Sequence, residues 1–188
     1  MQDTIKRQIQ DSIRTKQEVL AELVPEIEKT AKILISALKN NNKILVCGNG
    51  GSAADAQHFA GELIVRFETE RKPLPAIALT TDSSVLTATA NDYCFDECFA
   101  RQVNGLGTKG DVLVAISTSG NSPNILKAIE AAKARGMEVI GLTGRDGGKM
   151  KSLQNRIIIP SDSTARIQEC HIMTIHILCR LIDDAFSR

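Results

Sequence analysis

From Lys43 onward the sequence alternates short apolar runs with longer segments of helical periodicity, and this alternation limits the possible folds more than any other feature. The runs are rich in Val, Ile and Leu, which is typical of strands buried on both faces of a parallel sheet covered by helices. We therefore expect an α/β fold: a three-layer α/β/α domain around a five-stranded parallel sheet. The expected strands are residues 43–47, 75–79, 112–116, 138–142 and 156–159, and the expected helices are 52–66, 83–104 with a break near Asp92, 123–135, 147–153 and 164–185.

Residues 1–42 precede this pattern and contain none of the 13 glycines of the chain. An apolar stripe at helical spacing includes Ile5, Ile9 and Ile13, and a second stripe starts after a break at Pro25. We predict a pair of helices here, placed before the main domain. Their apolar stripes need a partner surface, which is either the domain itself or another copy of the chain.

Length and composition exclude several classes of function. A chain of 188 residues fits one domain with a helical extension. Its 23 Lys and Arg balance 22 Asp and Glu, so we expect neither nucleic acid nor an anionic membrane as a partner. The N-terminal segment is polar and no apolar run approaches the roughly 20 residues of a membrane span, which favours a cytoplasmic protein. Five Cys without a CxxC pair are expected to be structural thiols.

Two expected strands end in loops rich in glycine and hydroxyl groups, Gly48–Ser52 and Ser117–Ser122. Ligands of open parallel sheets bind at the carboxyl ends of the strands, and the free N–H groups of a helix N-terminus favour an anion. The second loop is the better phosphate candidate, because it has more hydroxyls than one cap needs and Pro123 makes Ser122 the natural N-cap. Neither loop has a Walker lysine or a GxGxxG motif, which disfavours nucleoside triphosphates and dinucleotides. An ordinary turn with a serine cap would also explain either loop.

The helix after the first loop carries His58 and Glu62 four residues apart, on one face. An imidazole and a carboxylate in that relation can share a metal ion or act as an acid and a base. Arg66 would extend the row by another turn of the same helix. A solvent-exposed ion pair is the alternative explanation of this row.

The final expected helix is apolar around most of its circumference, so we expect it to be buried. Gln168, His171 and His176 interrupt that surface, and a buried unpaired polar group costs about 1–3 kcal/mol. One site that combines Gln168 and His176 with His58 and Glu62 would satisfy all four, whereas a hydrogen-bonded core histidine would explain each imidazole alone. Because Gln168 and His176 are about 12 Å apart along the axis, meeting at one ion would stretch both side chains or require helices from different chains.

Four segments together resemble the phosphoheptose isomerase family, within the sugar isomerase (SIS) superfamily, and the similarity covers the whole chain. They are CGNGGSAADAQHFAGEL, TANDYCFDECFARQV, AISTSGNSPNI and TARIQECHIMTIHILCRLID. The resemblance implies a single flavodoxin-like SIS domain that interconverts sedoheptulose 7-phosphate and D-glycero-D-manno-heptose 7-phosphate through an enediol(ate), at the start of ADP-heptose biosynthesis for surface polysaccharide. It also implies a cytoplasmic homotetramer with active sites between subunits, one zinc ion (Zn²⁺) per subunit, and subunit packing through residues 1–42.

The resemblance further implies roles for individual residues. Glu62 matches the catalytic base and His176 the acid, and the zinc ligands are His58, Glu62, Gln168 and His176. The phosphate of the sugar is expected at Ser117, Thr118, Ser119 and Ser122. The full set of expected substrate contacts is Asn49, Gly50, Gly51, Ser52, Glu62, Arg66, Asn91, Asp92, Ser117, Thr118, Ser119, Ser122 and Gln168.

Two non-enzymatic functions fit the same fold. Some SIS proteins are tetrameric regulators that bind a replication initiator protein, and others sense phosphosugars beside a DNA-binding domain. A regulator would not require an acid and a base, whereas this sequence has both Glu62 and His176. It shows neither a helix-turn-helix nor a basic segment. We therefore expect the enzyme.

Overall fold

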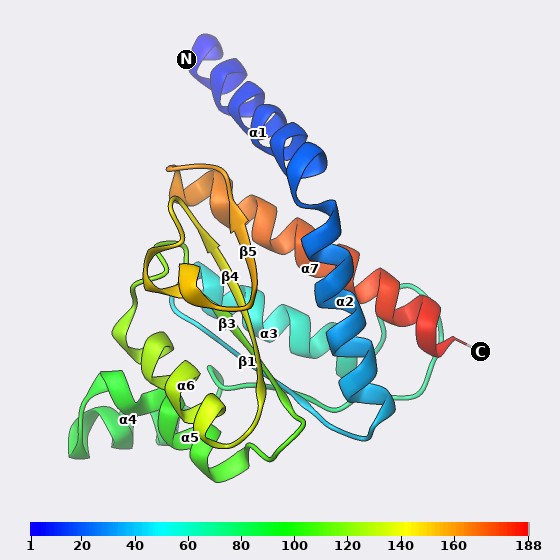
Figure 1. The fold of residues 1–188 in the computed structure, drawn as a ribbon. Helices are drawn as coiled ribbons and strands as arrows, with labels where there is room; N and C mark the ends of the chain where they lie inside the picture. The colour runs from blue at the N-terminus through cyan, green and yellow to red at the C-terminus, as the bar shows by residue number, and fades with distance from the viewer. Residues whose placement is uncertain (188) are drawn as a thin grey trace.

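Five parallel strands form the centre of the molecule, as expected, in the order β2-β1-β3-β4-β5. Figure 1 shows the computed structural model, which describes residues 1–187. The strand order reverses between β1 and β3, and in flavodoxin-like sheets ligands bind at that point, beyond the carboxyl ends of the strands. Each strand lies within two residues of its expected position. The strands are β1 (Ile44–Gly48), β2 (Ala76–Ala78), β3 (Val112–Ile116), β4 (Glu138–Gly144) and β5 (Asn155–Ile159).

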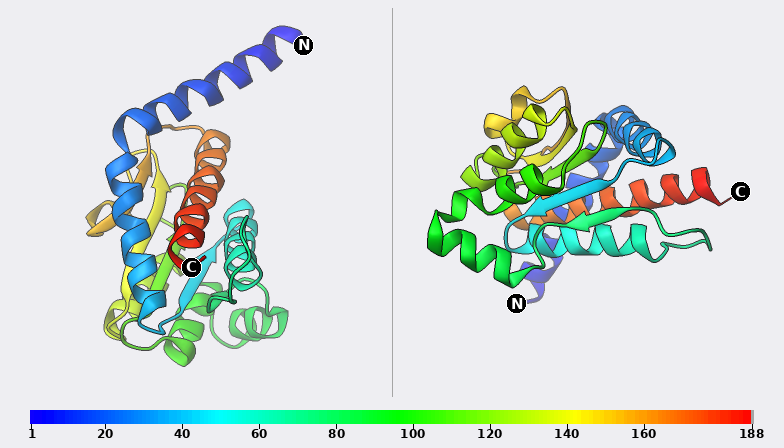
Figure 2. Two further views of the ribbon diagram at one scale, coloured as in Figure 1. Left: turned by 90° about the vertical axis from the view of Figure 1, so that its right-hand side faces the viewer. Right: turned by 90° about the horizontal axis from the view of Figure 1, so that it is seen from below.

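Helices cover both faces of the sheet, which confirms the three layers (Figure 2). α2, α3 and α7 pack on one face, and α5 and α6 on the other. The region 83–104 is divided near Asp92, as expected, by a short 3₁₀ turn. Residues 147–153 form only a 3₁₀ turn, because Gly147 and Gly148 both have positive φ angles that an α-helix does not allow. The helices are α1 (Gln2–Glu22), α2 (Val24–Lys39), α3 (Gly51–Ile64), α4 (Ser83–Asp92), α5 (Cys98–Leu106), α6 (Pro123–Ala134) and α7 (Thr164–Phe186), and the 3₁₀ turns are η1 (Phe95–Glu97) and η2 (Gly148–Ser152).

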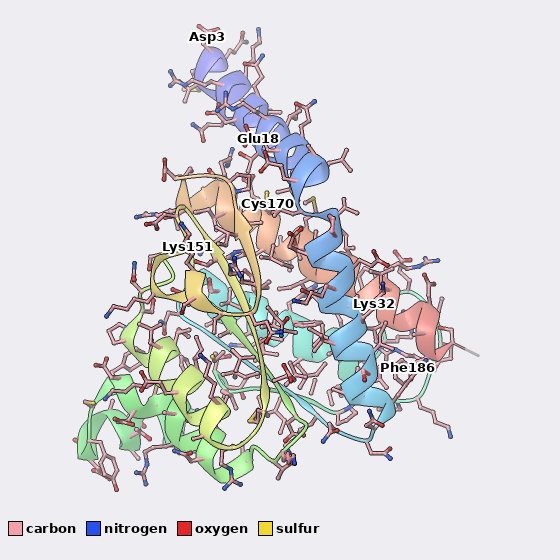
Figure 3. The ribbon with its side chains drawn as sticks, viewed as in Figure 1. Asp3, Glu18, Lys32, Lys151, Cys170 and Phe186 are labelled. Atoms are coloured by element: carbon pink, nitrogen blue, oxygen red, sulfur yellow. The ribbon has the colours of Figure 1, made fainter. Side chains whose placement is uncertain are left out.

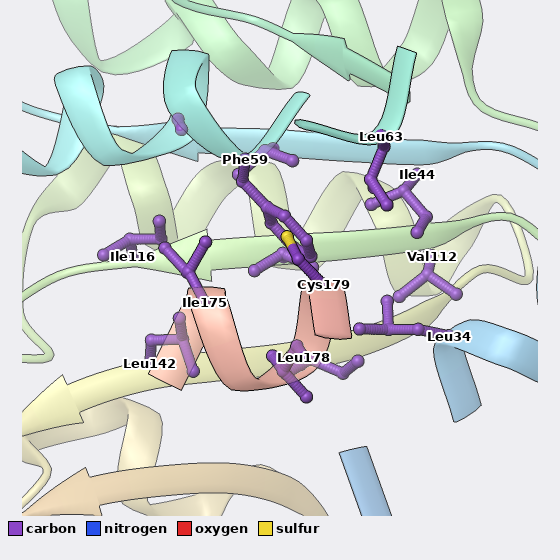
Figure 4. Packing of buried hydrophobic residues seen from close by; sticks show 14 of the residues in the cluster. Leu34, Ile44, Phe59, Leu63, Val112, Ile116, Leu142, Ile175, Leu178 and Cys179 are labelled. Atoms are coloured by element: carbon purple, nitrogen blue, oxygen red, sulfur yellow. The ribbon is translucent and has the colours of Figure 1, made fainter. Parts of the chain in front are cut away.

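The sheet has an apolar core layer on each face. In β1, Ile44 and Val46 point to the layer of α2, α3 and α7, while the alternate residues of the strand point to the layer of α5 and α6. Figure 4 shows Phe59 of α3 beside Cys179 of α7, and Leu63 of α3 beside Ile44 of β1. This packing holds α3 against α7, the two helices that carry the candidate acid and base.

α1 projects away from the body of the molecule, and its side chains extend into the surroundings along much of its length (Figures 1 and 3). The chain breaks at Leu23, and Pro25 lies in the first turn of α2, which confirms the expected helical pair. Ile5, Ile9 and Ile13 are each more than half exposed, so the main domain of the same chain does not cover their stripe. Neither α1 nor any other helix within residues 1–187 is long and apolar enough to cross a membrane.

Candidate functional site

The loops after β1 and β3 lie side by side at the carboxyl edge of the sheet, where a pair of amide side chains joins them. Nδ2 of Asn49 donates to Oδ1 of Asn124 at 2.9 Å, and Nδ2 of Asn124 donates to Oδ1 of Asn49 at 2.9 Å. Asn124 is buried in the first turn of α6. The pair therefore fixes the first expected loop against the helix that follows the second.

Glycines let the first loop pack closely against its surroundings. A Cβ on Gly48 would lie 2.4 Å from the backbone oxygen of Ser52, and Gly50 has a φ of +56°. A Cβ on Gly51 would lie 2.6 Å from Nε2 of Gln168, so this side chain of α7 reaches the start of α3. Ser52 is buried beneath the turn. The absence of side chains at these glycines thus lets the Gln168 amide approach the start of α3.

The second loop gathers hydroxyl groups at the N-terminus of α6. Ser122 occupies the N-cap position, as expected, but its side chain makes no capping hydrogen bond. Its hydroxyl instead lies 3.1 Å from the hydroxyl of Ser117, and the hydroxyl of Ser119 accepts from the backbone N–H of Asn121 at 3.2 Å. Thr118 lies between them and is half-buried. Hydroxyls and a helix N-terminus at one place form a site suited to a phosphate.

A second turn supports the hydroxyl loop from beneath. Gly120 has a φ of +66°, and a Cβ there would lie 2.1 Å from the backbone oxygen of Gly147. The backbone N–H of Met150 donates to the oxygen of Gly120 at 3.3 Å, and that of Lys149 donates to Oδ1 of Asn121 at 3.1 Å. The turn after β4 therefore holds the backbone of the hydroxyl loop in place.

Two imidazoles and a carboxylate meet where α3 and α7 cross the edge of the core. Nε2 of His58 lies 2.9 Å from Nε2 of His176 and 3.3 Å from Oε1 of Glu62. The ring of Phe67 stacks on His176, with centroids 5.5 Å apart. The side chain of His58 is 44% exposed and that of Glu62 21% exposed, so solvent or a ligand can reach the cluster. The polar row of His58 and Glu62 predicted on α3 therefore contacts His176 of α7.

Asp55 lies one turn before His58 on α3 and carries a carboxyl oxygen, Oδ2, that is buried without a hydrogen-bond partner among the described residues. Burial raises the pKa of Asp55 to about 6, against the opposing influence of His58. The carboxyl group therefore adds an acidic group to the face of α3 that carries His58.

The donor types in this cluster fit zinc. Zinc in proteins takes imidazole nitrogen and carboxylate oxygen, and catalytic sites commonly use three such ligands and keep one position open. Nε2 of His58 takes part in both contacts, so His176 and Glu62 lie on the same side of the His58 ring. Within residues 1–187 the His, Cys, Asp and Glu side chains do not form a group of three or more arranged around one ion. The fit thus rests on the chemistry of the donors.

Gln168 is not placed with these three side chains in one chain. It faces Gly51 at the start of α3, whereas His58 and His176 meet further along the two helices. The eight residues between Gln168 and His176 correspond to about 12 Å along α7. As the helical spacing indicated, Gln168 and His176 of one chain do not meet at one point, and Gln168 faces the first loop.

Arg66 does not continue the row on α3, and the expectation that it does is wrong. The helix ends at Ile64, because the carbonyl oxygens of its last turn are bonded by Arg71 and by the backbone N–H of Leu74. Arg66 is exposed in the loop that follows, with Nε 3.6 Å from Oε2 of Glu70.

Asn91 and Asp92 are also apart from the cluster. Nδ2 of Asn91 donates to Oδ1 of Asp92 at 2.8 Å at the exposed end of α4. Within residues 1–187, neither side chain forms a hydrogen bond to the two loops. The expected contact of Asn91 and Asp92 with a substrate therefore stays a prediction.

Comparison with known proteins agrees with this geometry. The SIS domain family matches residues 8–144. The phosphoheptose isomerase of Aromatoleum aromaticum is 57% identical over 183 residues, which cover 95% of this chain and 92% of that protein. The phosphoheptose isomerase of a Nitratiruptor species is 55% identical over 187 residues, which cover 99% of this chain and 100% of that protein. The chain belongs to the phosphoheptose isomerase family.

Solved structures of the family have the same fold over nearly the whole chain. The phosphoheptose isomerase of Neisseria gonorrhoeae superposes with a TM-score of 0.92 at 50% identity, covering 97% of this chain and 98% of that one. The phosphoheptose isomerase of Francisella tularensis gives a TM-score of 0.94 at 46% identity, covering 97% of each chain. The resemblance seen in the sequence motifs is confirmed, and the alternative of a non-catalytic regulator is not favoured.

Several residues of the site region were not predicted from the sequence. Asn124 pairs with Asn49 across 75 positions, and Phe67 stacks on His176 from a loop. Arg71 bonds the end of α3 and pairs with Asp183 of α7. No local pattern identifies such partners, because each depends on how distant segments pack. The support that the turn at Gly147 and Gly148 gives to the hydroxyl loop was also not predicted, since a helix was expected there.

Proposed function

We propose that this chain catalyses the interconversion of sedoheptulose 7-phosphate and D-glycero-D-manno-heptose 7-phosphate, the first step of ADP-heptose biosynthesis in the cytoplasm. The observation that carries the proposal is the cluster of His58, Glu62 and His176, in which His58 lies 2.9 Å from one partner and 3.3 Å from the other. The cluster lies on α3, which begins at the first loop, and on α7, whose Gln168 faces Gly51 of that loop. The family relatives bear the name of the same activity.

The phosphate of the sugar binds the hydroxyl loop, in this proposal. Ser117, Thr118, Ser119 and Ser122 supply hydroxyl donors, and the N-terminus of α6 supplies backbone amides and a favourable dipole. These groups are neutral, which suits a chain with a net charge of +1. Binding energy at the phosphate, remote from the reacting carbons, positions C1 and C2 at the acid and base.

Glu62 and His176 carry the proton transfers. In the direction from ketose to aldose, the Glu62 carboxylate removes a proton from C1, which gives the enediol(ate), and a proton is then delivered to C2. His176 moves the proton between the two sugar oxygens, since O1 must lose a proton and O2 must gain one. Groups of these types contribute about 10²–10⁴-fold each when they are correctly placed.

The proposal includes one zinc ion per chain, held by His58, Glu62 and His176, with Gln168 as the expected fourth ligand. Bound zinc polarises a carbonyl oxygen as a Lewis acid. Support for this part comes from the imidazole and carboxylate donors that meet at His58. Gln168 would complete the set only by extending from its place beside Gly51, or from the α7 of a neighbouring subunit.

A homotetramer with active sites between subunits is also part of the proposal, with residues 1–42 as the extension of a single SIS domain that packs subunits together. The exposed isoleucines of α1 support it, because an apolar stripe of that kind is stabilised by burial against another surface. In that assembly, neighbouring chains would cover the exposed face of His58 and would bring Asn91 and Asp92 to the active site of another subunit.

Incubation of the purified protein with sedoheptulose 7-phosphate tests the substrate. The account predicts that an aldose 7-phosphate forms and that fructose 6-phosphate, a shorter ketose phosphate, reacts far more slowly. Binding of sedoheptulose 7-phosphate without any aldose product would favour a sensor or regulator and would reject the enzymatic proposal.

A further inference from the structure

An ion pair is fully buried between the loop after α3 and the end of α7, and neither of its side chains belongs to the cluster of His58, Glu62 and His176. Nε of Arg71 lies 2.6 Å from Oδ1 of Asp183, and both side chains are 0% exposed. Buried ion pairs add little stability compared with apolar residues of the same volume, because both charges lose their hydration. Retention of such a pair in the core therefore points to a requirement for a defined geometry.

The guanidinium of Arg71 bonds the end of the helix that carries the proposed base. It donates to the backbone oxygen of Leu63 at 2.8 Å, and to the backbone oxygen of Glu62 itself at 2.7 Å. A cation at the C-terminus of a helix is also favoured by the helix dipole. The backbone of Glu62 is thus fixed directly by a side chain outside α3.

Both oxygens of the Asp183 carboxylate accept hydrogen bonds. Its Oδ2 accepts from the backbone N–H groups of Glu68 and Thr69, at 2.9 Å and 3.0 Å, and from the hydroxyl of Thr69 at 3.2 Å. Burial by itself would raise the pKa of Asp183, but the amides of Thr69 and Glu68 together with Arg71 hold it below its usual value. The pair therefore joins α3, the loop after it and α7 in one network.

The network lies at the C-terminal ends of α3 and α7, beyond the cluster along both helices. Asp183 follows His176 by seven residues, which is two helical turns on the same side of α7. Between His176 and Asp183, Cys179 of α7 packs beside Phe59 of α3, and both side chains are buried (Figure 4). A change in the network would shift one helix along the other and alter the separation of Glu62 and His176.

We infer that Arg71 and Asp183 are positioning residues that hold α3 and α7 in the register at which Glu62 and His176 can exchange protons with one substrate. The inference rests on the proposed function for the roles of Glu62 and His176. Displacement of a catalytic group by about 1 Å can cost on the order of 100-fold in rate.

A second carboxylate in the same chain provides a matched control. Asp111, at the start of β3 and far from the carboxyl edge, accepts from Lys43 N and Nζ at 3.0 Å and 2.6 Å and from Thr108 N and Oγ1 at 2.8 Å and 2.9 Å. Like Asp183, it combines two backbone amides, one threonine hydroxyl and one cation. Asp111→Asn and Asp183→Asn therefore remove the same charge from similar networks, of which one touches α3 and α7.

The experiment measures kcat and KM for both variants at a temperature well below their unfolding midpoints. Both should unfold at a lower temperature than the wild type. Asp183→Asn should lower kcat by about 10–100-fold, with little change in KM because the hydroxyl loop is untouched, and Asp111→Asn should keep the wild-type kcat. A wild-type kcat for Asp183→Asn, or an equal loss in both variants, would overturn the inference.

Two further measurements keep the test decisive. If Asp183→Asn does not fold, Arg71→Lys, which keeps the charge but loses the planar fork of donors, takes its place with the same expectation. Histidine ring NMR signals of His58 and His176 should shift in the Asp183 or Arg71 variant and stay in place in Asp111→Asn. An inactive wild type would refute the proposed function alone, and unchanged ring signals would then refute the positioning role independently.

Discussion

Nε2 of His58 and Nε2 of His176 lie 2.9 Å apart, although 118 positions separate the two residues in the chain. At this distance one imidazole donates a hydrogen bond and the other accepts it, or both share a cation. The contact brings together α3, which follows the glycine loop, and α7, which carries Gln168. It turns a row of polar residues on one helix into a site made by two helices.

Removal of the His58 imidazole should release the metal. We expect the wild-type protein to bind about one zinc ion per chain and His58→Ala to bind far less, since a missing imidazole removes one of the protein ligands. Elemental analysis after dialysis measures this directly. Cys94→Ser is the control, because Cys94 is an exposed thiol outside the cluster. Equal zinc content in wild type and His58→Ala would contradict the assigned ligand set.

A methyl group in the hydroxyl loop should weaken substrate binding. Gly120→Ala forces alanine to a φ of +66° and places its Cβ 2.1 Å from the backbone oxygen of Gly147. Such strain costs about 1–3 kcal/mol and is relieved by displacing the hydroxyl loop from its binding geometry. We therefore expect a KM for the phosphosugar about 5- to 150-fold higher, since each 1.4 kcal/mol is a factor of ten in binding. Gly105→Ala, where a Cβ meets open space, should leave KM unchanged.

The apolar stripe of α1 should hold subunits together. Ile9 is 56% exposed in the single chain, so a charge at that position should oppose burial between copies. Light scattering should find wild-type tetramers and smaller species for Ile9→Glu. Gln10→Glu adds the same charge at the next position and should remain tetrameric. A tetramer of undiminished stability in Ile9→Glu would exclude α1 from the subunit contacts.

The features that could be predicted from the sequence are those that depend on neighbouring residues in the chain. Continuous apolar runs such as those that became β1 and β3 define the sheet, because strands buried on both faces have no polar face to preserve. The two loops and the polar row of His58 and Glu62 were found by the same local patterns. The end of α3 was placed two residues too late, because it is set by hydrogen bonds from Arg71, which the local sequence does not contain.

The arrangement of the site residues depends on distant contacts and was less predictable. The helical spacing of Gln168 and His176 indicated that meeting at one ion would stretch both side chains or require helices from different chains. The fold places Gln168 beside Gly51. Asn124 was absent from the expected site, because its pairing with Asn49 exists only once β1 and β3 are neighbours.

His171 should make the stability of the protein depend on pH. It is fully buried, its Nε2–H donates to the backbone oxygen of Thr143 at 3.0 Å, and burial lowers its pKa to about 4. Between pH 6.5 and 4 the unfolded chain binds a proton that the folded chain does not, so the free energy of unfolding falls as the pH is lowered through this window. The loss is about 3 kcal/mol at most.

Urea unfolding of the wild type and of His171→Leu at several pH values checks this contribution. We expect the variant to be less stable at neutral pH, because it leaves a carbonyl unpaired, but to lose less stability than the wild type between pH 6.5 and 4. If the free energy of unfolding fell equally with pH in the two proteins across that range, His171 would not be held neutral by the fold.

Proton NMR of a sedoheptulose 7-phosphate solution tests the central claim most directly, with the wild type and Glu62→Gln compared at equal concentration. The carboxamide keeps the shape of the side chain but cannot accept the C1 proton, so both proteins should be folded. The account predicts aldose signals that grow to equilibrium with the wild type, and a rate at least about 10²-fold lower with Glu62→Gln. Absence of aldose with the wild type, or an undiminished rate with Glu62→Gln, would contradict it.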